Sequence, residues 1–110
     1  MKASGVIIFL LICLLAAAGF SADKTGHEIF KSNGCFLCHR QNRTSGTNPT
    51  LSELANAYKG KKEQLIQFFK GETQPIVHPQ RAVIMKRQIE KTKALSDSER
   101  AALADFILSH

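Results

Sequence analysis

The sequence predicts an all-α fold, and three observations lead to that prediction. Apolar residues recur at spacings of three and four along the central and C-terminal segments, which is the period of a helix with one buried face. The tetrapeptides 50–53 and 96–99 read Thr-Leu-Ser-Glu and Ser-Asp-Ser-Glu, the spacing of a capping box at a helix N-terminus. No alternating run of apolar and polar residues is long enough to indicate a sheet. We therefore expect four or five short helices.

Residues 1–22 are predicted to be a secretory signal peptide. Lys2 gives a positive start, an apolar run extends from Val6 to Ala18, and small residues follow it. Because this run is shorter than the roughly 20 residues that span a bilayer, cleavage between residues 18 and 23 is favoured over retention as an anchor. Lipidation of Cys13 is less favoured still, since Ile12 stands where lipoprotein signals carry a small residue.

The 88 residues that follow, 23–110, are expected to form one small domain without repeats or linkers. A core of that size is marginal, so a covalently bound apolar group would stabilise it considerably. The formal net charge of this domain is about +5, which is the +6 of the whole chain without Lys2. Its basic residues form no run typical of nucleic-acid binding. They favour weak docking to acidic proteins or to anionic lipid surfaces.

Three short helices are predicted before residue 72. The first lies within residues 23–33. After an aperiodic loop over residues 40–48, the second runs from the first capping box to residue 58, and the third covers residues 61–70. Each is followed within two residues by a glycine, which ends helices readily: these are Gly34, Gly60 and Gly71.

The C-terminal part is predicted to contain a loop and then a helix. Pro75 and Pro79 indicate that residues 72–83 are irregular. The second capping box begins the last helix, because apolar residues then recur at helical spacing and form a stripe that can be buried. The residues of that stripe are Leu103, Phe106 and Ile107.

The pattern Cys-x-x-Cys-His at residues 35–39 carries the most specific chemical information. It is the attachment pattern of a c-type haem. Cys35 and Cys38 can form thioethers with two vinyl groups on one porphyrin edge, and His39 can then bind the iron. A thioredoxin-like thiol pair would need a βαβ context, and a zinc site would need a second cysteine pair. With Cys13 removed in the leader, both remaining thiols are available to one haem.

Met85 is the expected sixth ligand of the iron. An electron-transfer haem is six-coordinate, and Met85 is the only thioether left once Met1 leaves with the leader. We expect it on an extended segment across the far haem face, anchored by Val83 and Ile84. Core filling is one alternative for this methionine. Ligation by His78 is another, and two imidazoles would give a lower potential. His27 and His110 are given no role.

Together these features resemble the small monohaem class I cytochromes c of bacteria, over the whole of residues 23–110. The resemblance implies a class I cytochrome c fold, in which the first and last helices cross around one haem. It implies that the backbone carbonyl of Pro49 accepts the N–H of His39 and orients the ring. It also implies that residues 83–85 form the strand bearing the distal methionine. The residues of the helix crossing would be Gly26, Phe30, Leu103 and Phe106.

The expected function is the transfer of single electrons between respiratory redox partners. The carrier would be a monomeric, exported protein with one covalent haem c, located in the periplasm or otherwise outside the cytoplasm. The chain is not expected to be an enzyme. It would hold both ligands, bury most of the porphyrin and leave one edge open to a redox partner. The side chains expected to pack on the haem are Leu51, Leu65, Phe68, Phe69 and Val83.

Two other functions stay open: a haem-bearing subunit of a larger oxidoreductase, for example one that oxidises sulfur compounds, and a gas sensor or weak peroxidase. The expected partners are redox proteins with acidic docking surfaces, and contact with a membrane would be transient or through those partners. Basic residues would ring the open haem edge and steer the partner to it. These are Lys59, Lys61, Lys62, Lys86, Arg87, Lys91 and Lys93.

Overall fold

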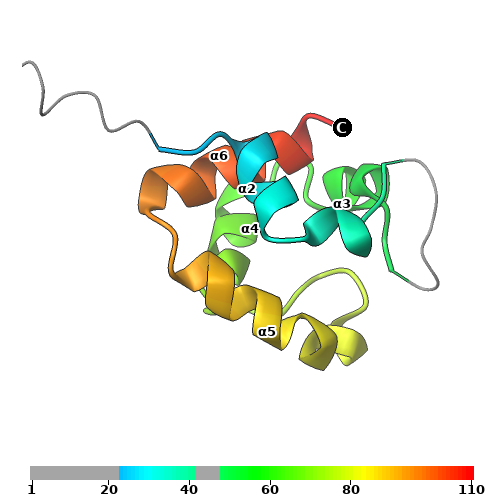
Figure 1. Cartoon of the computed structure of the whole chain (residues 1–110). Helices are drawn as coiled ribbons and strands as arrows, with labels where there is room; N and C mark the ends of the chain where they lie inside the picture. The colour runs from blue at the N-terminus through cyan, green and yellow to red at the C-terminus, as the bar shows by residue number, and fades with distance from the viewer. Residues whose placement is uncertain (1–22, 42–47) are drawn as a thin grey trace, which may run out of the picture.

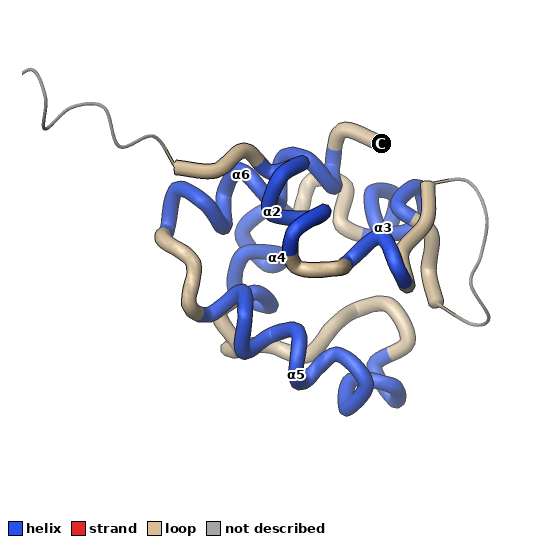
Figure 2. Tube along the Cα trace, in the orientation of Figure 1, coloured by secondary structure: helices blue, strands red, loops and turns tan. Residues whose placement is uncertain are grey.

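The structure, a computed structural model, describes residues 23–41 and 48–110. The predicted signal peptide lies outside these residues, as does most of the loop predicted at 40–48. Within the described residues the chain forms five α-helices and no β-strand, which confirms the all-α prediction (Figures 1 and 2). The helices are α2 (Gly26–Ser32), α3 (Leu51–Ala57), α4 (Lys62–Phe69), α5 (Ala82–Lys93) and α6 (Asp97–Leu108).

Side-chain caps set the start of three helices. Thr25, Thr50 and Ser96 accept hydrogen bonds from the backbone N–H three residues further on, at 3.2, 3.1 and 3.1 Å. Ser96 also completes the predicted capping box, because the Glu99 carboxylate accepts from the Ser96 N–H at 3.1 Å. At Thr50 only the first of the two capping-box bonds is present. These local signals explain why the predicted helix starts agree with the structure.

The first and last helices cross at a position where only glycine fits. α2 lies across α6 (Figure 1). A Cβ placed on Gly26 would lie 2.1 Å from the Ala102 carbonyl oxygen and 2.7 Å from Phe106 Cβ. Phe30 is buried, and its ring centre lies 5.3 Å from that of Phe106. Leu103 is buried in the same core, so the predicted crossing is confirmed.

One hydrophobic core joins α2, α3, α4 and α6, while α5 packs mainly against α4 and a short 3-10 helix, η2 (Pro79–Arg81). α5 therefore forms a separate wall of the molecule, facing the segment that follows α2 (Figure 1). None of the described helices is long and apolar enough to cross a membrane. The largest fully buried side chains of the core are Ile29, Phe30, Leu51, Tyr58 and Leu103.

The extended segment predicted at residues 83–85 is wrong, because these residues lie in the first turn and a half of α5. The resemblance had implied a strand here. In the helix, however, Val83 is 75% exposed and Ile84 55%, so neither anchors its neighbour by burial. The predicted irregular segment 72–83 is also too long. It ends at His78, after which η2 and then α5 begin.

Candidate functional site

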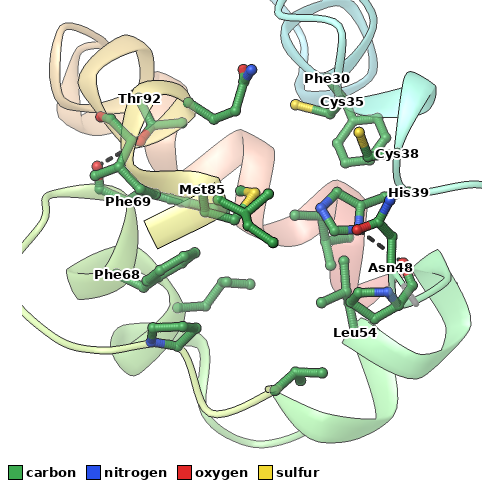
Figure 3. Close-up of a pocket in the computed structure, with 18 of the residues that line it drawn as sticks. Phe30, Cys35, Cys38, His39, Asn48, Leu54, Phe68, Phe69, Met85 and Thr92 are labelled. Carbon is green, nitrogen blue, oxygen red and sulfur yellow. Dashed lines mark hydrogen bonds between the residues drawn. The ribbon is translucent and has the colours of Figure 1, made fainter. Parts of the chain in front are cut away.

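A large apolar pocket lies between α5 and the rest of the fold (Figure 3). Its empty space is about 1220 Å³, the open mouth included. Aromatic and aliphatic side chains from four helices form most of its walls: Leu54, Leu65, Phe68, Phe69, Ile89, Leu103 and Ile107.

The cysteine motif stands on one wall of this pocket. Gly34 follows α2 in the left-handed region, with φ 76°, and turns the chain into a 3-10 helix, η1 (Cys35–Leu37). The His39 N–H then donates to the Cys35 carbonyl at 2.8 Å, so the five motif residues wind into one compact turn. As a result Cys35, Cys38 and His39 all line the pocket (Figure 3).

The ring of His39 is buried and held by a backbone carbonyl. Its Nδ1 lies 2.8 Å from the Pro49 oxygen. Because a carbonyl oxygen only accepts, Nδ1 carries the proton and Nε2 keeps a lone pair for a metal. The Leu51 N–H donates to the Arg40 carbonyl at 2.8 Å and ties the Pro49 segment to the end of the motif. The structure thus contains the contact that the resemblance implied for Pro49.

The surroundings of Cys35 do not favour a nucleophilic thiol. Burial raises the pKa of Cys35 from 9.0 to about 11, although the ammonium group of Lys91 acts in the opposite direction. A nucleophilic cysteine needs a lowered pKa. The elements described around it are helices, so the βαβ context of a thioredoxin-like site is not present in residues 23–41 and 48–110. Neither observation supports that alternative.

Met85 lies on the wall opposite the cysteine motif. Its side chain projects from α5 into the pocket, toward the side that holds His39 (Figure 3). Ile89 and Thr92, one and two helical turns further on, line the pocket from the same face of α5. An imidazole nitrogen and a thioether sulfur are therefore presented from two walls of one apolar cavity. This donor pair is one that haem iron takes in cytochromes.

Three of the five predicted packing residues line the pocket: Leu65, Phe68 and Phe69. Leu51 does not, since it is fully buried in the core at 0% exposure. Val83 does not either, because α5 is a helix that turns position 83 outward while Met85 faces in. The predictions for Leu51 and Val83 as haem-packing residues are therefore wrong.

Several lining residues were not predicted as such. Leu54 and Tyr58 belong to the predicted second helix but were not expected in the site, and Ile89 and Thr92 were not singled out at all. Helical spacing from Met85 would have found the last two, since residues four and seven positions away share its face. His78 also lines the pocket, but it is exposed and its φ is 47°. His27 and His110 instead contact the ring of Phe106.

Comparison with known families gives the assignment. A family model described as Cytochrome c matches residues 24–110 of the chain. The chain belongs to the cytochrome c family. The match spans every described helix and every residue of the pocket, which agrees with the predicted fold and its resemblance. No curated protein matches this cytochrome significantly.

Membership of the family establishes the cofactor and the general function. A small single-domain cytochrome c carries one covalent haem c and transfers electrons, so this cytochrome is a haem-bearing electron-transfer protein. Its pocket fits that group on chemical grounds. The walls are apolar, two thiols stand at one side, and a nitrogen donor and a sulfur donor face the interior.

Proposed function

We propose that this cytochrome is an exported carrier of single electrons between redox proteins. Cys35 and Cys38 would hold the haem, and His39 and Met85 would supply a nitrogen and a sulfur ligand to its iron. The observation that supports this most directly is the contact of His39 with the Pro49 carbonyl, opposite Met85 in the same pocket. Haem c supplies a one-electron couple between ferric and ferrous iron when it is bound.

The residues of the chain prepare that couple for fast transfer at a high potential. The Pro49 carbonyl orients His39 and makes it a stronger donor. Met85 contributes a thioether, which favours ferrous over ferric iron and so raises the potential. Phe68, Phe69 and the other apolar walls keep water from the site and disfavour the additional positive charge of the ferric state. None of these contributions requires the polypeptide to make or break a covalent bond during electron transfer.

Export follows from the predicted signal peptide and from the chemistry of attachment, because c-type haem is attached outside the cytoplasm. The mature protein should begin between residues 18 and 23, carry one haem that survives acid–acetone extraction, and occur in the extracytoplasmic fraction. Intact-mass measurement checks the first two points together. Haem released into the solvent would contradict covalent attachment at Cys35 and Cys38.

The assignment of Met85 predicts a defined set of spectral changes. The ferric protein should show the weak long-wavelength charge-transfer band of sulfur-to-iron ligation, and the ferrous protein should bind carbon monoxide poorly at neutral pH. Met85→Ala should abolish the band, lower the potential and admit carbon monoxide, because the sixth position loses its ligand. The matched control is His78→Ala, at a residue that lines the same pocket. The assignment is wrong if His78→Ala has these effects and Met85→Ala does not.

We also propose that the partner of this carrier is an acidic redox protein. Lys59, Lys61, Lys86 and Arg87 are exposed. The other three predicted docking residues have partners within the molecule. Lys62 pairs with Asp105 at 2.8 Å, Lys93 pairs with Glu90 at 3.5 Å, and the Lys91 ammonium group donates to the Asn33 carbonyl at 3.3 Å. The first four are therefore expected to contribute most to docking.

A further inference from the structure

The helix that carries Met85 is secured at one end and open at the other. The N-terminus of α5 has no side-chain cap, and Val83 and Ile84 in its first turn are largely exposed. The C-terminal end is different. Thr92 is buried there at 5% exposure, and Arg100 reaches it from α6. Met85 lies in the half of α5 that is nearer the open end.

Thr92 connects α5 to the end of α4. Its hydroxyl donates to the Phe69 carbonyl at 2.7 Å in a buried position and also lies 3.1 Å from the Ile89 carbonyl. Phe69 is the last residue of α4, whose terminal carbonyls have no partner within their own helix. Thr92 lies seven residues after Met85, about 10.5 Å along the axis of α5, and both side chains line the pocket.

Arg100 connects the same end of α5 to α6. Its Nη1 donates to the carbonyl of Lys93 at 3.1 Å and to those of Thr92 and Leu95, and its Nη2 pairs with Asp97 at 2.5 Å. The Arg100 side chain is only 9% exposed, so its bonds to the carbonyls are shielded from water, whereas the Asp97 side chain is 92% exposed. A cation at the carbonyl end of a helix is also favoured by the helix dipole. One guanidinium thereby joins the end of α5, the turn after it and the start of α6.

We propose that Thr92 and Arg100 are positioning residues for Met85. They lock the C-terminal half of α5 to α4 and α6, and this keeps the opposite half from swinging away from the pocket. The main packing partners of α5 are α4 and the short η2, so few other contacts fix its direction. This inference rests on the proposed ligation by Met85, and it explains how a sulfur on a largely exposed helix stays in place.

The test uses substitutions in the haem-loaded protein that keep the charge. Thr92→Val removes the hydroxyl with little change of shape, and Thr92→Ser retains it. Arg100→Lys keeps the positive charge but loses the planar fork that reaches several carbonyls at once. Ile29→Val is the matched control, because Ile29 is a 1% exposed core residue that does not line the pocket. Each protein is examined for its ferric long-wavelength band, its potential, its carbon monoxide binding and its stability.

Thr92→Val and Arg100→Lys should weaken the ferric band, lower the potential and speed carbon monoxide binding about tenfold, since each leaves buried carbonyls without a donor. Thr92→Ser should behave as wild type. Ile29→Val should reduce stability without changing the band or the carbon monoxide rate. If the Thr92→Val protein does not accumulate with haem, the milder variant Arg100→Lys tests the proposal by the same measurements.

Two results would overturn the proposal, and they differ in what else they overturn. If the two variants lose stability as Ile29→Val does but keep the wild-type band, potential and carbon monoxide rate, Thr92 and Arg100 are structural residues only. The ligation by Met85 then stands. If the wild-type protein itself has no such band, both the ligation by Met85 and the positioning roles fail.

Discussion

At the scale of single residues, the absence of a side chain at Gly26 decides how close two helices can come. The Ala102 carbonyl and Phe106 occupy the space where a Cβ would lie. This contact brings α2 onto α6, and α2 ends directly before the turn that carries Cys35. A change at Gly26 is therefore transmitted to the site through the backbone.

We expect Gly26→Ala to destabilise the haem-loaded protein by about 3 kcal/mol, the upper range for overpacking in a closely packed interior. Denaturant unfolding measures this free energy. Gly60→Ala is the control, because a Cβ there would meet nothing within 4 Å and only the positive φ of 73° is unfavourable. That variant should lose about 1 kcal/mol. Equal losses at the two glycines would show that the helix crossing is not restrictive.

At the scale of helices, α5 and α6 have the same length but are stabilised differently. Both have twelve residues. α6 begins at a complete capping box, and its inner face is buried in the core. α5 begins without a side-chain cap and buries only Thr92. Its stability therefore depends on neighbours: α4, the guanidinium of Arg100 and the group that fills the pocket.

Ser96→Ala should destabilise the protein by about 1 kcal/mol, because the first turn of α6 loses the acceptor for the Glu99 N–H. Thermal unfolding of the haem-loaded protein provides the measurement. Ser96→Asp keeps an acceptor at the same position and a favourable charge at the helix start, so it should stay within about 0.5 kcal/mol of wild type. An equal loss in both variants would argue against capping as the cause.

At the scale of the whole molecule, the pocket divides a small domain whose core alone gives marginal stability. α5 lies across the pocket from the cysteine motif, and it packs mainly against α4 and η2. When haem is bound, the lining residues of four helices all pack against it. Without it, their apolar surface would be open to water.

Removal of the haem should accordingly cost most of the helical structure. Cys35→Ala combined with Cys38→Ala should give a chain without covalent haem, and its far-ultraviolet circular dichroism should show a large loss of helix relative to the wild type. The charge and the buried core residues are unchanged in this double variant, so the loss reports on the cofactor. Helix content equal to that of the loaded protein would mean that the core of α2, α3, α4 and α6 suffices alone.

The docking proposal makes a prediction about rates. Association with an acidic redox partner should slow steeply as ionic strength rises, because long-range steering is screened. Lys86→Gln with Arg87→Gln should lower the rate at low salt and flatten its salt dependence, whereas Lys62→Gln, at a residue already paired with Asp105, should change it less. Stopped-flow kinetics with the physiological partner measures both. A rate that does not depend on salt would show that these charges only solubilise the protein.

The sequence by itself determined the features that depend on neighbouring residues. The cysteine motif is contiguous, so the grouping of Cys35, Cys38 and His39 could be inferred without a fold. Helix starts at Thr50 and Ser96 depend on a side chain and an N–H three residues apart. The crossing of the terminal helices was implied by the resemblance, and Gly26 stands at the position where the two helices touch.

Only the tertiary structure decided which residues meet across the pocket. The resemblance implied a strand at residues 83–85, but the face shared by Met85, Ile89 and Thr92 lies on a helix and is directed inward. The inward direction of that face depends on Phe69 and Arg100, which are 23 and 8 residues from Thr92 in the sequence. The orientation of a helix is fixed only when residues distant in the sequence bind its ends. Such contacts form between different helices, so the local sequence pattern of one helix cannot predict which of its faces will point into the pocket.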